Sequence, residues 1–186
     1  MPATSSNGPA VAERRSGWRL GTVAEVAEEW LVADRLARAA SLGAAYQDCL
    51  DSVVEADGRA AVQAGKAWPH DQRIVLHQEL LKPGREEDRD STFLHECAHI
   101  LADRHYGKPC RHGPLWRATI VMLGELPTTH HEIPYLSRKA HASYIWTCVA
   151  CGEEYPFVRK PRRRIRDCYC RHCGPDRGVL KQTVPA

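Results

Sequence analysis

Apolar residues recur at helical spacing in three stretches of this 186-residue chain. Residues 22–40 place apolar side chains along one face and predict an amphipathic helix that packs over the rest of the fold. A second helix is expected to begin at Asp90 or Ser91, either of which can cap its N-terminus, and to end at Gly107, which favours a left-handed C-cap. The third has Gly113 as N-cap, Pro114 as first helical residue, a buried stripe of Trp116, Ile120 and Leu123, and Gly124 as stop signal.

Shorter apolar runs predict strands. Val53 and Val54, residues 60–62 and residues 74–76 suggest a small sheet in the first half of the chain. Two further runs, residues 144–146 and 155–157, suggest a pair of short strands near the C-terminus. Helices packed on a small sheet make the expected fold class α+β.

The second predicted helix carries the pattern His95, Glu96, two intervening residues and His99. Residues four apart on a helix differ by about 40° in direction and about 6 Å in height, so both imidazoles can reach one ion. Zinc accepts neutral imidazole, and two such ligands leave room for a third protein group and a water molecule. Glu96 is placed to take a proton from that water, which predicts a zinc site with His95 and His99 as ligands and Glu96 as general base.

A third ligand has to come from outside this motif. His112 is the best candidate, because it lies between a turn at residues 107–109 and the start of the third helix, which would hold it between two packed helices. Asp103 lies too far along the helix from His95 to share its ion and is given at most a supporting role. Three alternatives remain open for the third ligand: His105, a glutamate at Glu125 or Glu132, and Cys110. His105 stands where the metzincin pattern has its third histidine, but Ala102 replaces the glycine of that pattern.

Four of the eight cysteines form two Cys-x-x-Cys-Gly pairs, Cys148 with Cys151 and Cys170 with Cys173. Two such turns can place four thiolates tetrahedrally around a second zinc ion, which predicts a structural zinc ribbon. A glycine after each pair accommodates the tight turn. Cys168 could replace Cys170, but the Cys-x-x-Cys-Gly pattern favours Cys170.

A basic segment lies between the two cysteine pairs. It comprises residues 159–166, and its six basic residues are Arg159, Lys160, Arg162, Arg163, Arg164 and Arg166. Positive charge beside the aromatic residues Tyr144, Trp146, Tyr155, Phe157 and Tyr169 is typical of a surface that contacts the nucleic-acid backbone and stacks on bases. The segment is therefore predicted to bind DNA without regard to sequence, and the alternative is a solvated loop.

Composition divides the chain into three parts. Residues 1–17 are rich in Pro, Gly, Ser and charge, so a disordered tail is expected here and not a signal peptide. Residues 18–143 are expected to form the first zinc domain and residues 144–186 the zinc ribbon. Within the first domain, the charged cluster at residues 85–90 is interpreted as a solvated loop. Residues 125–143 are expected to be a polar connector, and its histidines or Tyr135 could lie near the cleft as oxyanion-stabilising groups.

No apolar run approaches the ~18 residues of a membrane span. We therefore expect a cytoplasmic protein without a membrane partner. Eight cysteines in such a compartment indicate metal binding more than disulfides.

The histidine motif, followed after twelve residues by His112, Gly113, Pro114 and Trp116 and then by a Leu-Gly pair at positions 123 and 124, resembles the SprT-like family, which includes the Spartan proteases of DNA–protein crosslinks. The resemblance spans roughly residues 50–180. It implies a small zincin-like domain and a zinc-dependent protease that acts on DNA-bound proteins, with His95, His99 and His112 on the catalytic zinc and Glu96 as base.

A rival hypothesis from another class is a non-catalytic nucleic-acid-binding or transcription-associated zinc protein. Glu96 argues against it, because a structural zinc site needs no carboxylate beside a ligand and closes its coordination with four protein groups.

Overall fold

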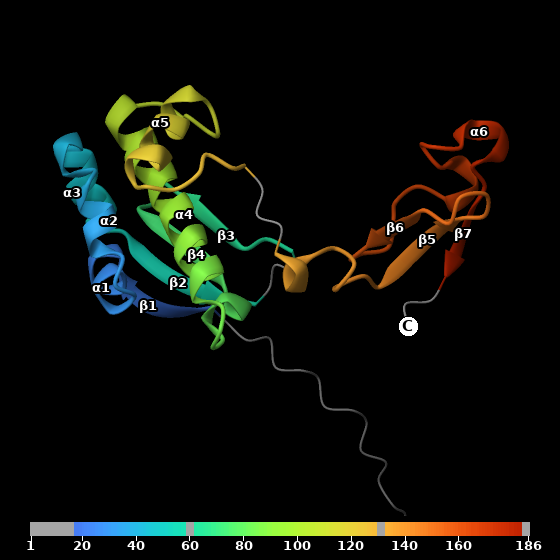
Figure 1. Ribbon diagram of the computed structural model, residues 1–186, viewed down its shortest axis with the longest axis horizontal. Helices are drawn as coiled ribbons and strands as arrows, with labels where there is room; N and C mark the ends of the chain where they lie inside the picture. The colour runs from blue at the N-terminus through green and yellow to red at the C-terminus, as the bar shows by residue number, and fades with distance from the viewer. Residues whose placement is uncertain (1–16, 59–61, 130–132, 184–186) are drawn as a thin grey trace, which may run out of the picture.

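The computed structural model describes residues 17–58, 62–129 and 133–183, and shows a mixed fold of helices and sheets. Its first sheet has four strands in the order β1-β2-β4-β3, with β2 and β4 parallel and the other neighbours antiparallel (Figure 1). β3 therefore ends the sheet. The strands are β1 (Trp18–Thr22), β2 (Val53–Asp57), β3 (Gly65–Trp68) and β4 (Arg73–His77).

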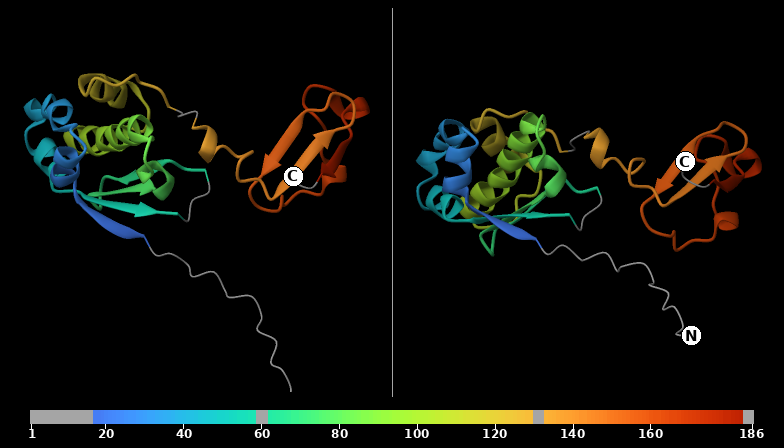
Figure 2. Two further views of the ribbon diagram at one scale, coloured as in Figure 1. Left: turned by 60° about the horizontal axis from the view of Figure 1, so that its bottom comes forward. Right: turned by 90° about the horizontal axis from the view of Figure 1, so that it is seen from below.

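Five helices accompany this sheet: α1 (Val23–Glu29), α2 (Ala33–Ala37), α3 (Ala44–Leu50), α4 (Glu86–Tyr106) and α5 (Pro114–Met122). Short 3₁₀ turns η1 (Ala40–Leu42) and η2 (Gln78–Leu81) precede α3 and α4, and η3 (Pro134–Leu136) follows α5. Figure 2 shows α4 lying across one face of the sheet. Phe93, Leu94, Cys97, Ile100 and Leu101 of α4 are fully buried in the core between the sheet and the other helices.

α4 begins earlier than its sequence suggests. Its first residue is Glu86, with Arg85 as N-cap, so Asp90 and Ser91 lie inside the helix and the cluster at 85–90 is not a loop. Glu86, Glu87 and Asp88 occupy the first turn, where acidic side chains favourably oppose the helix dipole. The predicted end is correct, because Gly107 closes the helix in the left-handed region with φ 63°.

The single helix predicted for residues 22–40 is instead two. Thr22 and Glu25 form a capping box that starts α1, but Leu31 adopts a φ of 58° and interrupts the helix before α2. Trp30, at this break, packs edge-on against Phe93 of α4 with ring centroids 5.3 Å apart. The segment thus covers the long helix as expected.

The other elements match the predictions unevenly. β2 and β4 contain the predicted runs at Val53–Val54 and 74–76, and α5 has Gly113 as N-cap and Pro114 in its first turn. β1, β3 and α3 were not predicted. Residues 1–16, 60 and 61, on which the tail and one strand were predicted, lie outside the described residues.

A second sheet of three antiparallel strands lies near the C-terminus, in the order β6-β5-β7. Figure 1 shows it as a unit of its own, which we call the cysteine unit: β5 (Tyr144–Cys148), β6 (Glu154–Phe157), η4 (Ile165–Asp167), α6 (Gly174–Arg177) and β7 (Leu180–Thr183). The buried residues of its core are few, namely Trp146, Cys148, Cys170 and Leu180. No helix among the described residues has the length and apolar character needed to cross a membrane.

Candidate metal centre

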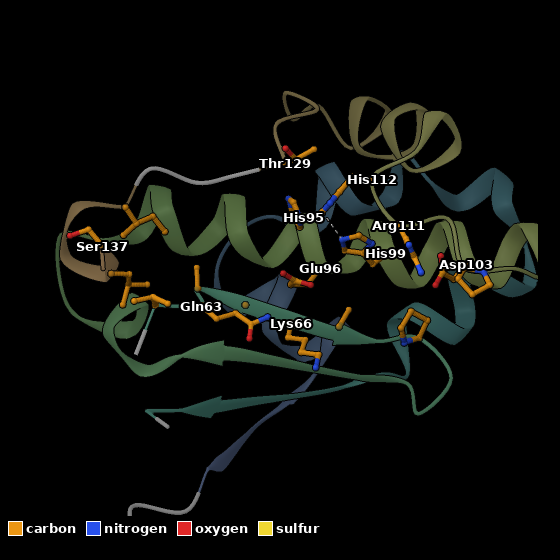
Figure 3. Close-up of a pocket in the computed structure, with 18 of the residues that line it drawn as sticks. Gln63, Lys66, His95, Glu96, His99, Asp103, Arg111, His112, Thr129 and Ser137 are labelled. Atoms are coloured by element: carbon orange, nitrogen blue, oxygen red, sulfur yellow. Dashed lines mark hydrogen bonds between the residues drawn. The ribbon is translucent and has the colours of Figure 1, made fainter. Parts of the chain in front are cut away.

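Three histidines converge on one point at the middle of α4. His95 and His99 lie one turn apart on that helix, and His112 reaches them from the loop before α5 (Figure 3). The Nε2 atom of His112 lies 3.0 Å from that of His95 and 3.1 Å from that of His99. Tetrahedral zinc with bonds of about 2.0–2.1 Å would hold its nitrogens about 3.3 Å apart. The three imidazoles therefore fit the ligand spacing of zinc with only small adjustment.

The surroundings keep the three rings in place and favour the neutral form of His99. Burial and the neighbouring His112 lower the pKa of His99 to about 4, which favours the neutral imidazole that binds metal. Trp116 of α5 is fully buried and packs against all three rings, with centroids 4.7 Å from His95, 5.3 Å from His99 and 4.6 Å from His112. One tryptophan thus forms a common wall behind the three histidines.

Glu96 lies beside this group and is only 7% exposed. Burial raises the pKa of its carboxyl to about 8, against the opposing effect of a hydrogen bond from the Ala67 backbone. β3 comes this close because Gly65 lacks a side chain: a Cβ there would lie 2.9 Å from Cγ of Glu96. A nearby dication would favour the carboxylate, the form that can accept a proton.

A cavity of about 980 Å³ opens in front of Glu96 and the histidines. Figure 3 shows Lys66 of β3 on one side of it and the Arg111–His112 loop on another. Ile133, Pro134 and Leu136, around η3, contribute an apolar wall. Because β3 ends its sheet, its outer edge has no partner strand among the described residues.

Comparison with known proteins places this site within a family. Residues 43–134 match the SprT-like family. Residues 43–134 therefore form a SprT-like domain. Protein SprT of Pseudomonas aeruginosa is 28% identical over 117 residues, covering 60% of this chain and 70% of the relative. Proteins of that name from Erwinia tasmaniensis (29% over 115 residues; 60% and 66%) and Proteus mirabilis (26% over 126 residues; 64% and 73%) are also similar. No solved structure shows a significant match.

Within the SprT-like domain, the rival metal ligands have other partners. Glu125 is held by Arg35 at 2.5 Å and accepts a hydrogen bond from Ser91 at 3.0 Å. Asp103 accepts a hydrogen bond from the Cys110 backbone N–H at 2.7 Å, and the Cys110 thiol faces the Lys108 carbonyl. None of these side chains, nor His105, belongs to the convergent group in the described part of the chain; Glu132 lies outside that part.

Tyr135 is not available as an oxyanion-stabilising group in this arrangement. Its hydroxyl donates to Asp88 at 2.7 Å, the Arg85 guanidinium stacks over its ring at 3.5 Å, and burial with the Asp88 contact raises its pKa to about 12. His141 lies against the Tyr135 carbonyl at 2.8 Å. The predicted connector histidines His130 and His131 lie outside the described residues.

The sulfur atoms of Cys148, Cys151, Cys170 and Cys173 form a second convergent group. Sulfur separations are 3.8 Å for Cys148 and Cys173 and 3.6 Å for Cys151 and Cys170. Tetrahedral zinc with bonds of about 2.3 Å would place them about 3.8 Å apart. Cys168 is not in the group, and the glycines after both pairs adopt positive φ, 76° at Gly152 and 74° at Gly174.

Tyr155 of β6 orients one of these sulfurs. Its hydroxyl donates to Sγ of Cys170 at 3.1 Å and accepts from the Arg171 backbone N–H at 3.1 Å. The hydrogen bond from Tyr155 is the main reason that the pKa of Cys170 falls to about 6. Sequence reasoning read Tyr155 as a stacking residue and missed this role, because the contact joins residues 15 positions apart.

All six side chains of the basic segment are exposed. Arg164 pairs with Asp167 at 2.7 Å, so part of its charge is already neutralised. The predicted aromatic surface is smaller than expected: Trp146 is only 6% exposed and packs against Phe157, whereas Tyr169 is 55% exposed. Trp146 belongs to the core of the small unit because it lies on the same face of β5 as Cys148, where it packs with Cys170 and Leu180.

Proposed function

We propose that this protein is a zinc-dependent peptidase of the SprT-like type, acting on proteins bound to DNA. The observation that carries the proposal is the meeting of three imidazole nitrogens and one buried carboxylate at the same cavity. Zinc would be held by His95, His99 and His112, which leave one position of a tetrahedral site open. That open position distinguishes a hydrolytic site from a purely structural one.

The residues have separate tasks in peptide hydrolysis. When bound, zinc supplies a Lewis acid that lowers the pKa of water and polarises a carbonyl. Glu96 accepts the proton of the attacking water and passes it to the leaving amine nitrogen. The Ala67 N–H that faces Glu96 fixes the orientation of this carboxylate.

The open edge of β3 gives a substrate its place. Along an antiparallel strand the backbone groups of alternate residues face alternate edges. The Ala64 carbonyl accepts from the His77 N–H of β4, so Ala64 directs its backbone groups toward β4. Gly65 and Ala67 therefore direct theirs toward the cavity, which agrees with the Ala67 N–H facing Glu96. An extended peptide can add to such an edge through main-chain hydrogen bonds, which do not depend on its sequence.

The cysteine unit supports the choice of substrate. Zinc would hold its four thiolates, and the exposed basic segment would then contact phosphates of DNA through charge alone. A protein bound to the same DNA would be presented to the cavity at raised effective concentration, while free proteins would be spared.

The deciding experiment compares native protein with Glu96→Gln, each carrying two equivalents of zinc, on a DNA-bound protein and on the same protein without DNA. Native protein should cleave, and cleave faster when DNA is present. Glu96→Gln should keep both metals and lose cleavage by at least about a hundredfold, because an amide cannot accept the proton. DNA binding without any cleavage by the native protein would instead favour a non-catalytic zinc protein.

A further inference from the structure

His112 is the one histidine of the convergent group that no helix holds. It lies in the loop between Gly107, which ends α4, and Gly113, which caps α5. The preceding residue, Arg111, has a φ of 46°, an uncommon conformation for a residue with a side chain. Such a conformation persists only where surrounding contacts enforce it.

Besides the contact of the Cys110 thiol with the Lys108 carbonyl, three hydrogen bonds hold this loop. The Asp103 carboxylate accepts from the Cys110 N–H at 2.7 Å, the Cys110 carbonyl accepts from the Gly113 N–H at 3.0 Å, and the His112 carbonyl accepts from Nε of Arg117 at 3.2 Å. The last two are made within the loop and α5. Of the three, only the hydrogen bond to Asp103 connects the loop to α4.

Helix geometry explains why residue 103 can do this. His95, His99 and Asp103 follow one another at steps of four residues, so their side chains share a face of α4. The first two reach the metal position and the third reaches the loop that brings His112. An acidic side chain in the last turn is unfavourable for the helix dipole, so Asp103 contributes little to α4 itself.

We propose that Asp103 is a positioning residue for the metal centre: by holding the Cys110 backbone it sets the distance of His112 from His95 and His99. This inference rests on the zinc site proposed above. Outer partners that orient a metal ligand commonly change metal affinity by about 10–100-fold when removed. Asp103 lies at the edge of the cavity but outside the metal group, and it acts on His112 through the backbone of the loop.

The test measures zinc affinity at the histidine site in full-length protein, by competition with chelators of graded strength. Cobalt substitution identifies the site, because four thiolates give intense charge-transfer absorption and three imidazoles do not. The cysteine site serves as an internal standard in every sample. Asp103→Ala should lower affinity at the histidine site by about 10–100-fold and leave the cysteine site unchanged.

Two further variants separate positioning from general folding. Asp103→Asn retains a carbonyl oxygen that can accept from Cys110, so its affinity should lie within a few fold of native. Asp48→Ala removes an ion pair with Arg104, the residue next to Asp103, in which the side chains are 2.5 Å apart. That variant perturbs the same end of α4 without touching the loop and should keep native affinity.

Each result has a distinct meaning. Native affinity in Asp103→Ala, or an equal loss in Asp103→Asn or Asp48→Ala, would overturn the positioning role and leave the metal centre intact. Absence of metal at the histidine site of the native protein would instead refute the proposed function itself. Far-UV circular dichroism at matched concentration checks that the variants remain folded.

Discussion

The two candidate metal centres are built in opposite ways. Two of the three histidines, His95 and His99, lie on α4, whose Phe93 and Leu94 are fully buried in the main core, and His112 comes from the loop between α4 and α5. The cysteine unit encloses only four residues, and two of these, Cys148 and Cys170, are themselves members of the metal group. So small a core cannot offset the entropy of folding by burial alone. The domain that carries the histidines should therefore fold without metal, whereas the cysteine unit should need metal to fold.

Metal removal should produce the largest effect. A strong chelator is expected to unfold the cysteine unit, because ligation supplies most of its folding free energy, and to leave the SprT-like domain folded. Limited proteolysis with mass analysis measures this directly: cleavage should appear within residues 144–183 and not within α4. Cys151→Ser, which removes one ligand, should reproduce that pattern without chelator. Resistance of the cysteine unit to proteolysis after complete metal removal would show that it does not need metal to fold.

Trp116→Ala tests whether the histidine centre, unlike the cysteine unit, depends on apolar packing for its stability. Removing this fully buried ring should lower the free energy of unfolding of the SprT-like domain by about 3–5 kcal/mol. The matched control is Val121→Ala on the same helix, whose side chain is 55% exposed and whose truncation should cost no more than about 0.5 kcal/mol. Denaturant unfolding followed by far-UV circular dichroism gives both values. Equal losses would show that Trp116 is not the structural wall of the site.

The sequence predicted the features of the histidine centre that depend on neighbouring residues and missed those that depend on the rest of the fold. His95, Glu96, His99 and the Gly113–Pro114 start of α5 were readable because their chemistry or turn propensity is local. The β3 edge was not, since four residues, Gly65–Trp68, are too short to show strand alternation. The start of α4 was misread because Glu86, Glu87 and Asp88 look like a solvated cluster until the helix behind them is known.

Contacts distant in sequence were equally hidden. Arg35 holds Glu125 across 90 positions, which removes a glutamate that sequence reasoning kept as a possible ligand. Trp146 was expected to be a surface aromatic and is instead buried, because it lies on the face of β5 that packs with Cys170 and Leu180. Neither outcome follows from local spacing.

A smaller effect is expected for Tyr155→Phe, which removes only the hydroxyl that donates to Cys170. The cysteine site should lose about 10–100-fold in metal affinity, while the histidine site keeps its own. Chelator competition with cobalt absorption resolves the two. An unchanged cysteine site would mean that the thiolate needs no such partner, and a change at the histidine site would mean that the two centres are coupled.

The basic segment should have the least effect on either centre. Arg162, Arg163 and Arg164 are exposed and lie outside both metal groups, so replacing all three with Ala should change neither metal content nor folding. DNA binding should weaken at every sequence, and the slope of log affinity against log salt should flatten by up to about 0.9 for each phosphate that the variant no longer neutralises. Cleavage of DNA-bound protein should lose its stimulation by DNA while basal peptide hydrolysis stays the same. A triple Ala replacement of Arg171, Arg177 and Lys181 removes the same charge from other exposed positions of the cysteine unit, so an equal loss there would show that net charge and not this segment holds the DNA.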